Sequence, residues 1–263
     1  MKESLHLVDS HAHLSLKEFE EDRSQVIQRA FKAGVLAILC PAEVTEAQNL
    51  DTALKLIEKY ENIIIAAGVH PHQARLFNPD CSRRIKDLAR AHKIKAVGEI
   101  GLDFHYNFSE PYCQQDVFRF QLHLAQELDL PVIIHSRESS RELLACIKEE
   151  KFSKGGIIHC FTEDWYLAEK MMDLNFLISF SGIITFPKAY HLRETAKKIP
   201  LEKLLIETDS PYLVPLAYRG KLKRNEPLYV KEVANTLAAV KDLPLELITE
   251  TTTRNFKSFF CLK

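Results

Sequence analysis

Eight short runs of apolar, largely β-branched residues recur along this chain. They cover residues 5–8, 35–40, 63–69, 96–100, 132–134, 157–158, 176–180 and 204–206. Stretches with apolar residues three and four apart lie between or after them, at 18–32, 47–60, 82–92, 114–128, 139–150, 229–240 and 245–260. Continuously apolar strands joined by amphipathic helices are typical of a parallel sheet that is covered on both faces.

Eight strand-helix units are the number that closes into a TIM (β/α)8 barrel, which is an α/β fold. The chain has 263 residues, of which 46% are hydrophobic, and this suits one barrel with one core. We therefore expect a single domain over residues 1–263, with the helices at 229–240 and 245–260 as extra C-terminal helices that cover the outside or the base. An open, doubly wound sheet is the alternative fold.

Side chains that commonly bind metal ions lie within or just after five of the apolar runs. They are His11 and His13 after the first run, Glu99 in the fourth, His135 after the fifth, His159 after the sixth and Asp209 after the eighth. Two histidines two residues apart on an extended segment point to the same face and can bind one ion. Only a closed barrel brings the carboxyl ends of these strands to one mouth, so the barrel explains this pattern better than the open sheet does.

A second group of residues stands near the same predicted strand ends. Arg137 lies two residues beyond His135, on the same face, and suits an anionic substrate. We expect His70 and His72 to face the same mouth and to contact substrate or the groups that support the ligands, with a surface loop position as an equal alternative for His72. We expect further substrate contacts from Arg219 and Asn225 in the basic loop at 218–227. We expect Glu207 and Asp103 to orient ligand histidines. Because strand side chains alternate, Cys160 is expected to point away from His159 into the core.

Composition narrows the classes of function. The formal net charge is −1, which argues against a protein that coats nucleic acid or binds a membrane surface through a broad basic face. No apolar stretch approaches the length of a membrane span, and residues 1–4 do not begin a signal-peptide core. The six cysteines are scattered, which indicates reduced thiols. We expect a cytoplasmic protein without an obligate protein partner.

Several segments together resemble the TatD-type metal-dependent hydrolases, a family of amidohydrolase-like barrels that includes deoxyribonucleases. These segments are VDSHAH, GVHP, GEIGLD, HSR, HCF, ETDSPYL and RGKLKRNEP, and they span nearly the whole chain. The resemblance implies a two-metal centre held by His11, His13, Glu99, His135, His159 and Asp209, with Glu99 bridging the ions. A bridging glutamate at the fourth strand also differs from the carboxylated lysine of phosphotriesterase-like barrels.

The resemblance implies hydrolysis of phosphodiester bonds in DNA, most simply from a strand end. Two divalent ions would lower the pKa of a water and make it a nucleophile, and Asp209 is the expected proton acceptor beside it. Mixed imidazole and carboxylate ligands suit Zn, Mn, Co or Ni, and Mg when a substrate phosphate completes its shell. Two alternatives remain open. One is an ester or amide hydrolase, acting for example on charged tRNA or a small ester, and the other is a non-catalytic metal-binding protein.

Overall fold

In the computed structural model, the eight strands form one parallel sheet. Their spatial order follows the chain from β1 to β8. The strands are β1 Leu7–Asp9, β2 Val35–Glu43, β3 Ile63–Gly68, β4 Ala96–Asp103, β5 Val132–Arg137, β6 Gly156–Ile158, β7 Phe176–Phe180 and β8 Leu204–Ile206. An order in which every strand pairs with its sequence neighbour excludes the doubly wound sheet, in which the order reverses. The TIM barrel that the sequence predicts is therefore confirmed.

The structure describes residues 6–262. Leu5, the predicted start of the first strand, and residues 1–4, where no signal-peptide core is expected, lie outside the described residues. No helix within 6–262 is long and apolar enough to cross a membrane.

Hydrogen bonds beyond the ends of β1 and β8 bring the two edges of the sheet together. The amide of Ser10 donates to the carbonyl of Ile206 at 3.0 Å, and the amide of Asp209 donates to the carbonyl of His11 at 2.9 Å. The amide of His13 donates to the carbonyl of Ser210 at 2.8 Å. The segments that bear three candidate ligands are thus the segments that complete the barrel.

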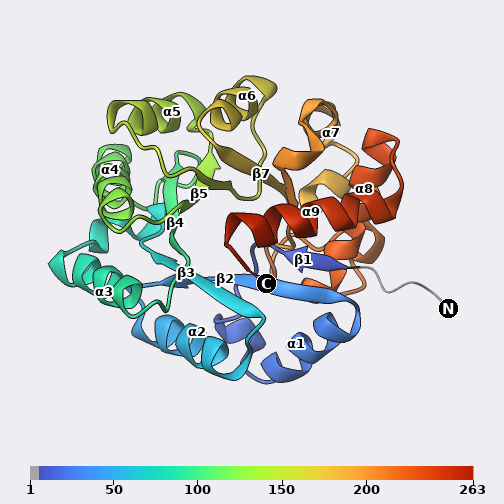
Figure 1. Cartoon of the computed structure of the whole chain (residues 1–263), viewed down its shortest axis with the longest axis horizontal. Helices are drawn as coiled ribbons and strands as arrows, with labels where there is room; N and C mark the ends of the chain where they lie inside the picture. Colours follow the sequence, from blue (N-terminus) through green and yellow to red (C-terminus); the bar gives the residue numbers. More distant parts are fainter. Residues whose placement is uncertain (1–5, 263) are drawn as a thin grey trace.

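Helices surround the barrel as an outer ring (Figure 1). They are α1 Arg23–Lys32, α2 Ala47–Lys59, α3 Pro79–Arg90, α4 Pro111–Glu127, α5 Ser140–Glu149, α6 Trp165–Asp173, α7 Tyr190–Lys198, α8 Val230–Lys241 and α9 Leu245–Phe259. Short 3-10 helices lie in the connecting segments. They are η1 Lys17–Phe19, η2 Pro71–Leu76, η3 Gly182–Thr185, η4 Leu201–Lys203, η5 Leu216–Tyr218 and η6 Pro227–Tyr229. The main core lies between this ring and the sheet.

Two helices begin earlier than the apolar periodicity predicts, because their first turns are defined by capping residues. Helix α3 starts at Pro79, and the side chain of Asn78 accepts hydrogen bonds from the amides of Asp80 and Cys81. Helix α4 starts at Pro111, where proline is favoured because its missing N–H would have no partner in a first turn. In contrast, residues 17–19 form η1, so α1 begins only at Arg23.

Helix α9 lies across one end of the barrel, as Figure 1 shows in red. Phe256, which is fully buried, and Phe260 belong to the same cluster as the barrel-filling residues Val8, Leu39 and Leu205. The C-terminal helix therefore closes the base of the barrel interior with two aromatic rings. The base is one of the two positions that the sequence predicts for it.

We predict that Phe256→Ala lowers the free energy of unfolding by about 3–5 kcal/mol, because it removes a buried ring and leaves a cavity under the barrel. Chemical denaturation followed by circular dichroism measures this. Leu247→Ala on the same helix is the control, since Leu247 is 41% exposed, and it should change stability by no more than about 0.5 kcal/mol. Equal losses in the two variants would contradict the proposed role of Phe256.

Candidate active site

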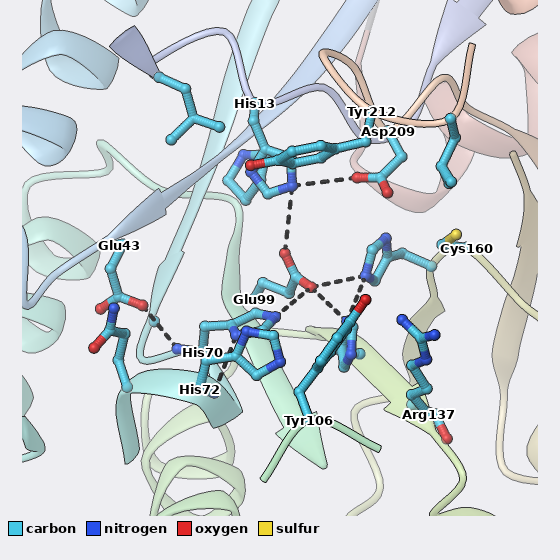
Figure 2. A pocket seen from close by; sticks show the side chains of 18 of the residues that line it. His13, Glu43, His70, His72, Glu99, Tyr106, Arg137, Cys160, Asp209 and Tyr212 are labelled. Atoms are coloured by element: carbon cyan, nitrogen blue, oxygen red, sulfur yellow. Dashed lines mark hydrogen bonds and ion pairs between the residues drawn. The ribbon is translucent and has the colours of Figure 1, made fainter. Parts of the chain in front are cut away.

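The carboxylate of Glu99 lies at the centre of the barrel mouth, between two pairs of histidines (Figure 2). Its Oε2 atom is 3.2 Å from Nε2 of His11 and 3.8 Å from Nε2 of His13. Its Oε1 atom is 3.0 Å from Nδ1 of His135 and 2.8 Å from Nε2 of His159. Each oxygen of one carboxylate therefore faces a different pair of imidazole nitrogens.

The remaining predicted ligand, Asp209, joins the same cluster. Its Oδ1 atom is 3.2 Å from Nε2 of His13. Asp209 has a φ of 54°, in the left-handed region, where aspartate is tolerated better than most residues. All six residues that the sequence singles out as metal-ligand candidates thus meet at one mouth.

Local sequence explains why Glu99 can reach this position. Gly101 follows it with a φ of +139°, and a Cβ atom built there would lie 2.0 Å from the backbone oxygen of His135. A side chain at this position would therefore separate β4 from β5, which pair at Gly101 and His135. Glycine allows the two strands that bear Glu99 and His135 to approach each other closely.

A carboxylate contacts the outer ring nitrogen of His135, in β5, and another contacts that of His159, which follows β6. Asp103 accepts contacts at Oδ2 from Nε2 of His135, at 3.2 Å, and from Nε2 of His72, at 2.8 Å. Glu207 is 3.3 Å from Nδ1 of His159. In both cases the second ring nitrogen remains directed at Glu99. Asp103 and Glu207 therefore occupy positions from which they can fix the orientation of an imidazole.

The ionisation of Glu99 and that of the histidines around it depend on one another. Burial opposes ionisation of Glu99, but the surrounding imidazoles, His159 first among them, outweigh this and hold the pKa of the carboxyl well below its usual value. Burial lowers the pKa of His159, whereas Glu99 and Glu207 raise it more strongly, so that its pKa lies well above the usual value. The imidazoles around Glu99 do not all respond alike, because burial lowers the pKa of His11 and lowers that of His70 to about 4.

His70 lies closer to Glu99 than its predicted role in substrate contact requires. Its Nε2 atom is 3.2 Å from Oε1 of Glu99, and with His135 the three residues form a group whose donor atoms all lie within 4.8 Å of one another. His11, His13 and Glu99 form a second such group. His70 thus has the geometry of a ligand as well as that of a wall residue.

The two predicted substrate-binding arginines are held by aromatic rings. The guanidinium carbon of Arg137 is 4.7 Å from the centre of the Tyr106 ring, and that of Arg219 is 4.7 Å from the centre of the Phe186 ring. Within residues 6–262, neither arginine forms an ion pair with a carboxylate. Arg224 differs, because it pairs with Asp22.

Two expectations about neighbouring residues are wrong. Asn225 is fully buried, and its side-chain amide donates to the carbonyl of Thr208 at 3.0 Å, so it braces the loop instead of facing a substrate. Cys160 does not point into the core but lines the cavity (Figure 2). Its φ of 43° ends the alternation of an extended strand, on which the expectation depended.

The mouth opens into a cavity of about 830 Å³. Its wall includes three residues that sequence analysis missed, namely Glu43, Tyr106 and Tyr212. Glu43 is the last residue of β2, and its position at a strand end is a signal that would have identified it. The two tyrosines stand in loops after β4 and β8, and no periodicity distinguishes them there.

Comparison with known proteins agrees with this geometry. The family model described as TatD related DNase matches residues 8–261. The chain belongs to the TatD family. It is 40% identical to YabD of Bacillus subtilis, an uncharacterized metal-dependent hydrolase, over 97% of this chain and 98% of that one. It is 34% identical to the 3'-5' ssDNA/RNA exonuclease TatD of Salmonella typhimurium, over 97% of this chain and 98% of the relative.

Solved structures give the same result for the fold. The crystal structure of YjjV, a TatD homologue from Escherichia coli K12, superposes with a TM-score of 0.90 at 31% identity, covering 98% of both chains. Organophosphorus hydrolase from Deinococcus radiodurans, at 13% identity and a TM-score of 0.68, shares the barrel. This TatD-family protein is thus a metal-dependent hydrolase, and its His, Glu and Asp cluster can bind divalent metal.

The partly buried position of Glu43 in this TatD-family site predicts how the stability of the protein depends on pH. Burial raises the pKa of its carboxyl from 4.5 to about 7, although hydrogen bonds from the amides of His70 and Thr45 oppose the shift. A raised pKa means that the folded state binds more protons than the unfolded state between these values, so this group lowers stability as pH rises from 4.5 to 7.

We expect Glu43→Gln to remove this loss. The difference in free energy of unfolding between the metal-free variant and the metal-free parent chain should grow by about 2 kcal/mol, in favour of the variant, from the lower to the upper end of that pH range. This value is smaller than the full pKa shift would give, because Glu43 is partly exposed. Urea denaturation across the range measures it. The exposed Glu61→Gln is the control and should leave the pH profile unchanged; a parallel profile for Glu43→Gln would refute the prediction.

Proposed function

We propose that this protein is a two-metal phosphodiesterase that removes nucleotides from the 3' end of single-stranded DNA. The observation that carries the proposal is the arrangement of four imidazoles around the two oxygens of Glu99. An exonuclease role is supported by the TatD relative named as a 3'-5' ssDNA/RNA exonuclease. The charge of −1 for the whole chain suits local recognition of a strand end better than continuous contact with a long duplex.

The donor set fits two ions with Glu99 as their common ligand. Nε2 of His11 and Nε2 of His13 are 3.2 Å apart, and Nδ1 of His135 and Nε2 of His159 are 3.3 Å apart. Two imidazole nitrogens and a carboxylate oxygen this close together would hold one ion in each group. Asp209 completes the first group, and His70 can complete the second. Zn, Mn, Co or Ni suit these ligands, and Mg suits them with a substrate phosphate.

Divalent ions bound there would lower the pKa of a water toward neutrality and neutralise charge on a phosphate. The protein groups then have separate tasks. Asp209, at the edge of the cluster, accepts the proton of the attacking water and returns it to the leaving oxygen. Arg137 and Arg219 bind phosphate oxygens, because no carboxylate within the described chain occupies their guanidinium groups.

We predict that Asp209→Asn lowers the rate of nucleotide release from end-labelled single-stranded DNA by at least about a hundredfold, because an amide cannot accept the proton. Metal-free protein is incubated with Mg²⁺, Mn²⁺, Co²⁺ or Zn²⁺ separately, and products are resolved on a sequencing gel. Asp242→Asn is a matched control, since Asp242 has the same left-handed φ of 54° at the end of α8.

Stepwise shortening by the parent chain and by Asp242→Asn, but not by Asp209→Asn, is the expected result. Full activity in Asp209→Asn would remove Asp209 from the mechanism. Turnover of ester or amide substrates, such as charged tRNA, together with no shortening under any metal, would replace the nuclease proposal with a carbonyl hydrolase at the same metal centre.

Metal content tests the bridging role of Glu99 separately from activity. We expect two ions per chain in the parent protein and one or none in Glu99→Ala, because both groups of histidines lose the shared carboxylate. Mass spectrometry of metals after equilibrium dialysis measures this. Glu138→Ala is the control, since Glu138 lies on a mouth loop but is 64% exposed. Two ions retained in Glu99→Ala would contradict the bridge.

A further inference from the structure

Three planar side chains form a column at the edge of the active-site mouth. The guanidinium of Arg137 lies over the Tyr106 ring at 4.7 Å, and the rings of Tyr106 and Phe108 are stacked, with centres 5.5 Å apart and planes 6° apart. We call these three residues the lip stack. Tyr106 is 50% exposed and Phe108 is 55% exposed. Two large rings thus remain open to solvent beside a polar site.

The lip stack is held in place by the active site itself. Oδ1 of Asp103 accepts hydrogen bonds from the amides of His105 and Tyr106, which fixes the start of the loop after β4. The ring of His72 packs edge-on against Phe108 at 4.8 Å and against Tyr106 at 5.7 Å. The exposed rings are therefore already ordered before a ligand arrives, so less conformational entropy is lost on binding.

The position of the stack relates it to the reaction site. Tyr106 and Arg137 line the same cavity as Glu99, and Figure 2 shows them on the opposite side of Glu99 from Tyr212. Asp103 joins the two regions directly, since its Oδ2 atom contacts His135 while its Oδ1 atom holds the loop. A strand whose terminal phosphodiester lies at Glu99 has this column beside it.

We propose that the lip stack binds an unpaired base of the substrate strand, next to the nucleotide that is removed. This inference rests on the proposed nuclease function and adds the residues that select a single strand. Every base has a face that stacks on an aromatic ring, whereas a base within a duplex has both faces covered by its neighbours. Arg137 continues the column and supplies positive charge for the adjoining phosphate.

A chemical double-mutant cycle tests the proposal. Binding of the metal-loaded protein to a fluorescent single-stranded oligonucleotide, protected from cleavage by phosphorothioate linkages, is measured by anisotropy. A series of oligonucleotides lacks one base each, with an abasic sugar at successive positions from the 3' end. We expect Phe108→Ala to weaken binding of the intact strand by about tenfold.

The decisive comparison is between the variant and the abasic series. At one position, removal of the base should weaken binding to the parent chain by a similar factor and should cause no further loss in Phe108→Ala. Phe108→Trp should bind the intact strand as tightly as the parent chain. Tyr112→Ala is the matched control, because Tyr112 is another exposed aromatic residue nearby in the chain, at the start of α4 and 70% exposed, that is not part of the stack.

The lip stack would be overturned as a base-binding site if the loss from Phe108→Ala and the loss from removing a base multiplied at every position. Equal affinities of Phe108→Ala and Tyr112→Ala for the intact strand would overturn it too, as would failure of the parent chain to bind. Shortening of the unprotected strand by the parent chain reports on the nuclease proposal alone. Shortening with unchanged binding by Phe108→Ala rejects the stack and keeps the nuclease. Stack-dependent binding without shortening under any metal rejects the nuclease and keeps the stack.

Discussion

The buried carboxylate of Glu99 is the group on which the rest of the site depends. A carboxylate removed from water is costly unless positive charge or hydrogen-bond donors face it. Five imidazoles face the two oxygens of Glu99, and those of His13, His135 and His159 have raised pKa values. Those imidazoles come from the ends of four strands, with His11 and His13 both after β1, so the barrel must hold β1, β3, β5 and β6 in register around β4. The same balance of charge is available to a cation in place of protons, which is why folding of the barrel and metal binding share one set of interactions.

Closure of the barrel uses the residues that also form the site. β1 and β8 are each only three residues long. The backbone beyond them, from Ser10 to His13 on one side and from Asp209 to Ser210 on the other, makes the hydrogen bonds that join the two edges. Asp9 adds to this junction, because its carboxylate accepts from the amide and hydroxyl of Thr208 at 2.8 and 2.6 Å. A change at this seam therefore alters the positions of His11, His13 and Asp209 together.

Sequence alone predicts those features that follow from repeated, local rules. Eight apolar runs specify the strands, and residues that follow a run fall toward the carboxyl end of a parallel barrel, so convergence of five of the ligand candidates follows from topology. Glu99 lies within its strand, and its position depends also on the close approach of β4 and β5 at Gly101. Features that depend on a single backbone torsion are not predictable in this way. Cys160 turns into the cavity because φ becomes positive there. Asn225 is buried by long-range hydrogen bonds to Thr208 and Leu213, which no local pattern encodes.

The arginines near the mouth differ in their partners within residues 6–262: one is neutralised by carboxylates and supports the structure, whereas two keep an uncompensated positive charge. Arg224, in the basic loop, is neutralised by Asp22 and Glu226 and ties the loop to α1. Arg137 and Arg219 instead rest on aromatic rings, which orient a guanidinium without cancelling its charge. Glu99, Asp103, Glu207 and Asp209 place four carboxylates near the same cavity. Under the proposed function, an anionic strand would meet favourable charge at the centre only when cations balance these groups, whereas the charges of Arg137 and Arg219 do not depend on the metal. For this electrostatic reason, the proposed function implies that metal loading and substrate binding are coupled at the centre of the mouth and independent at its edge.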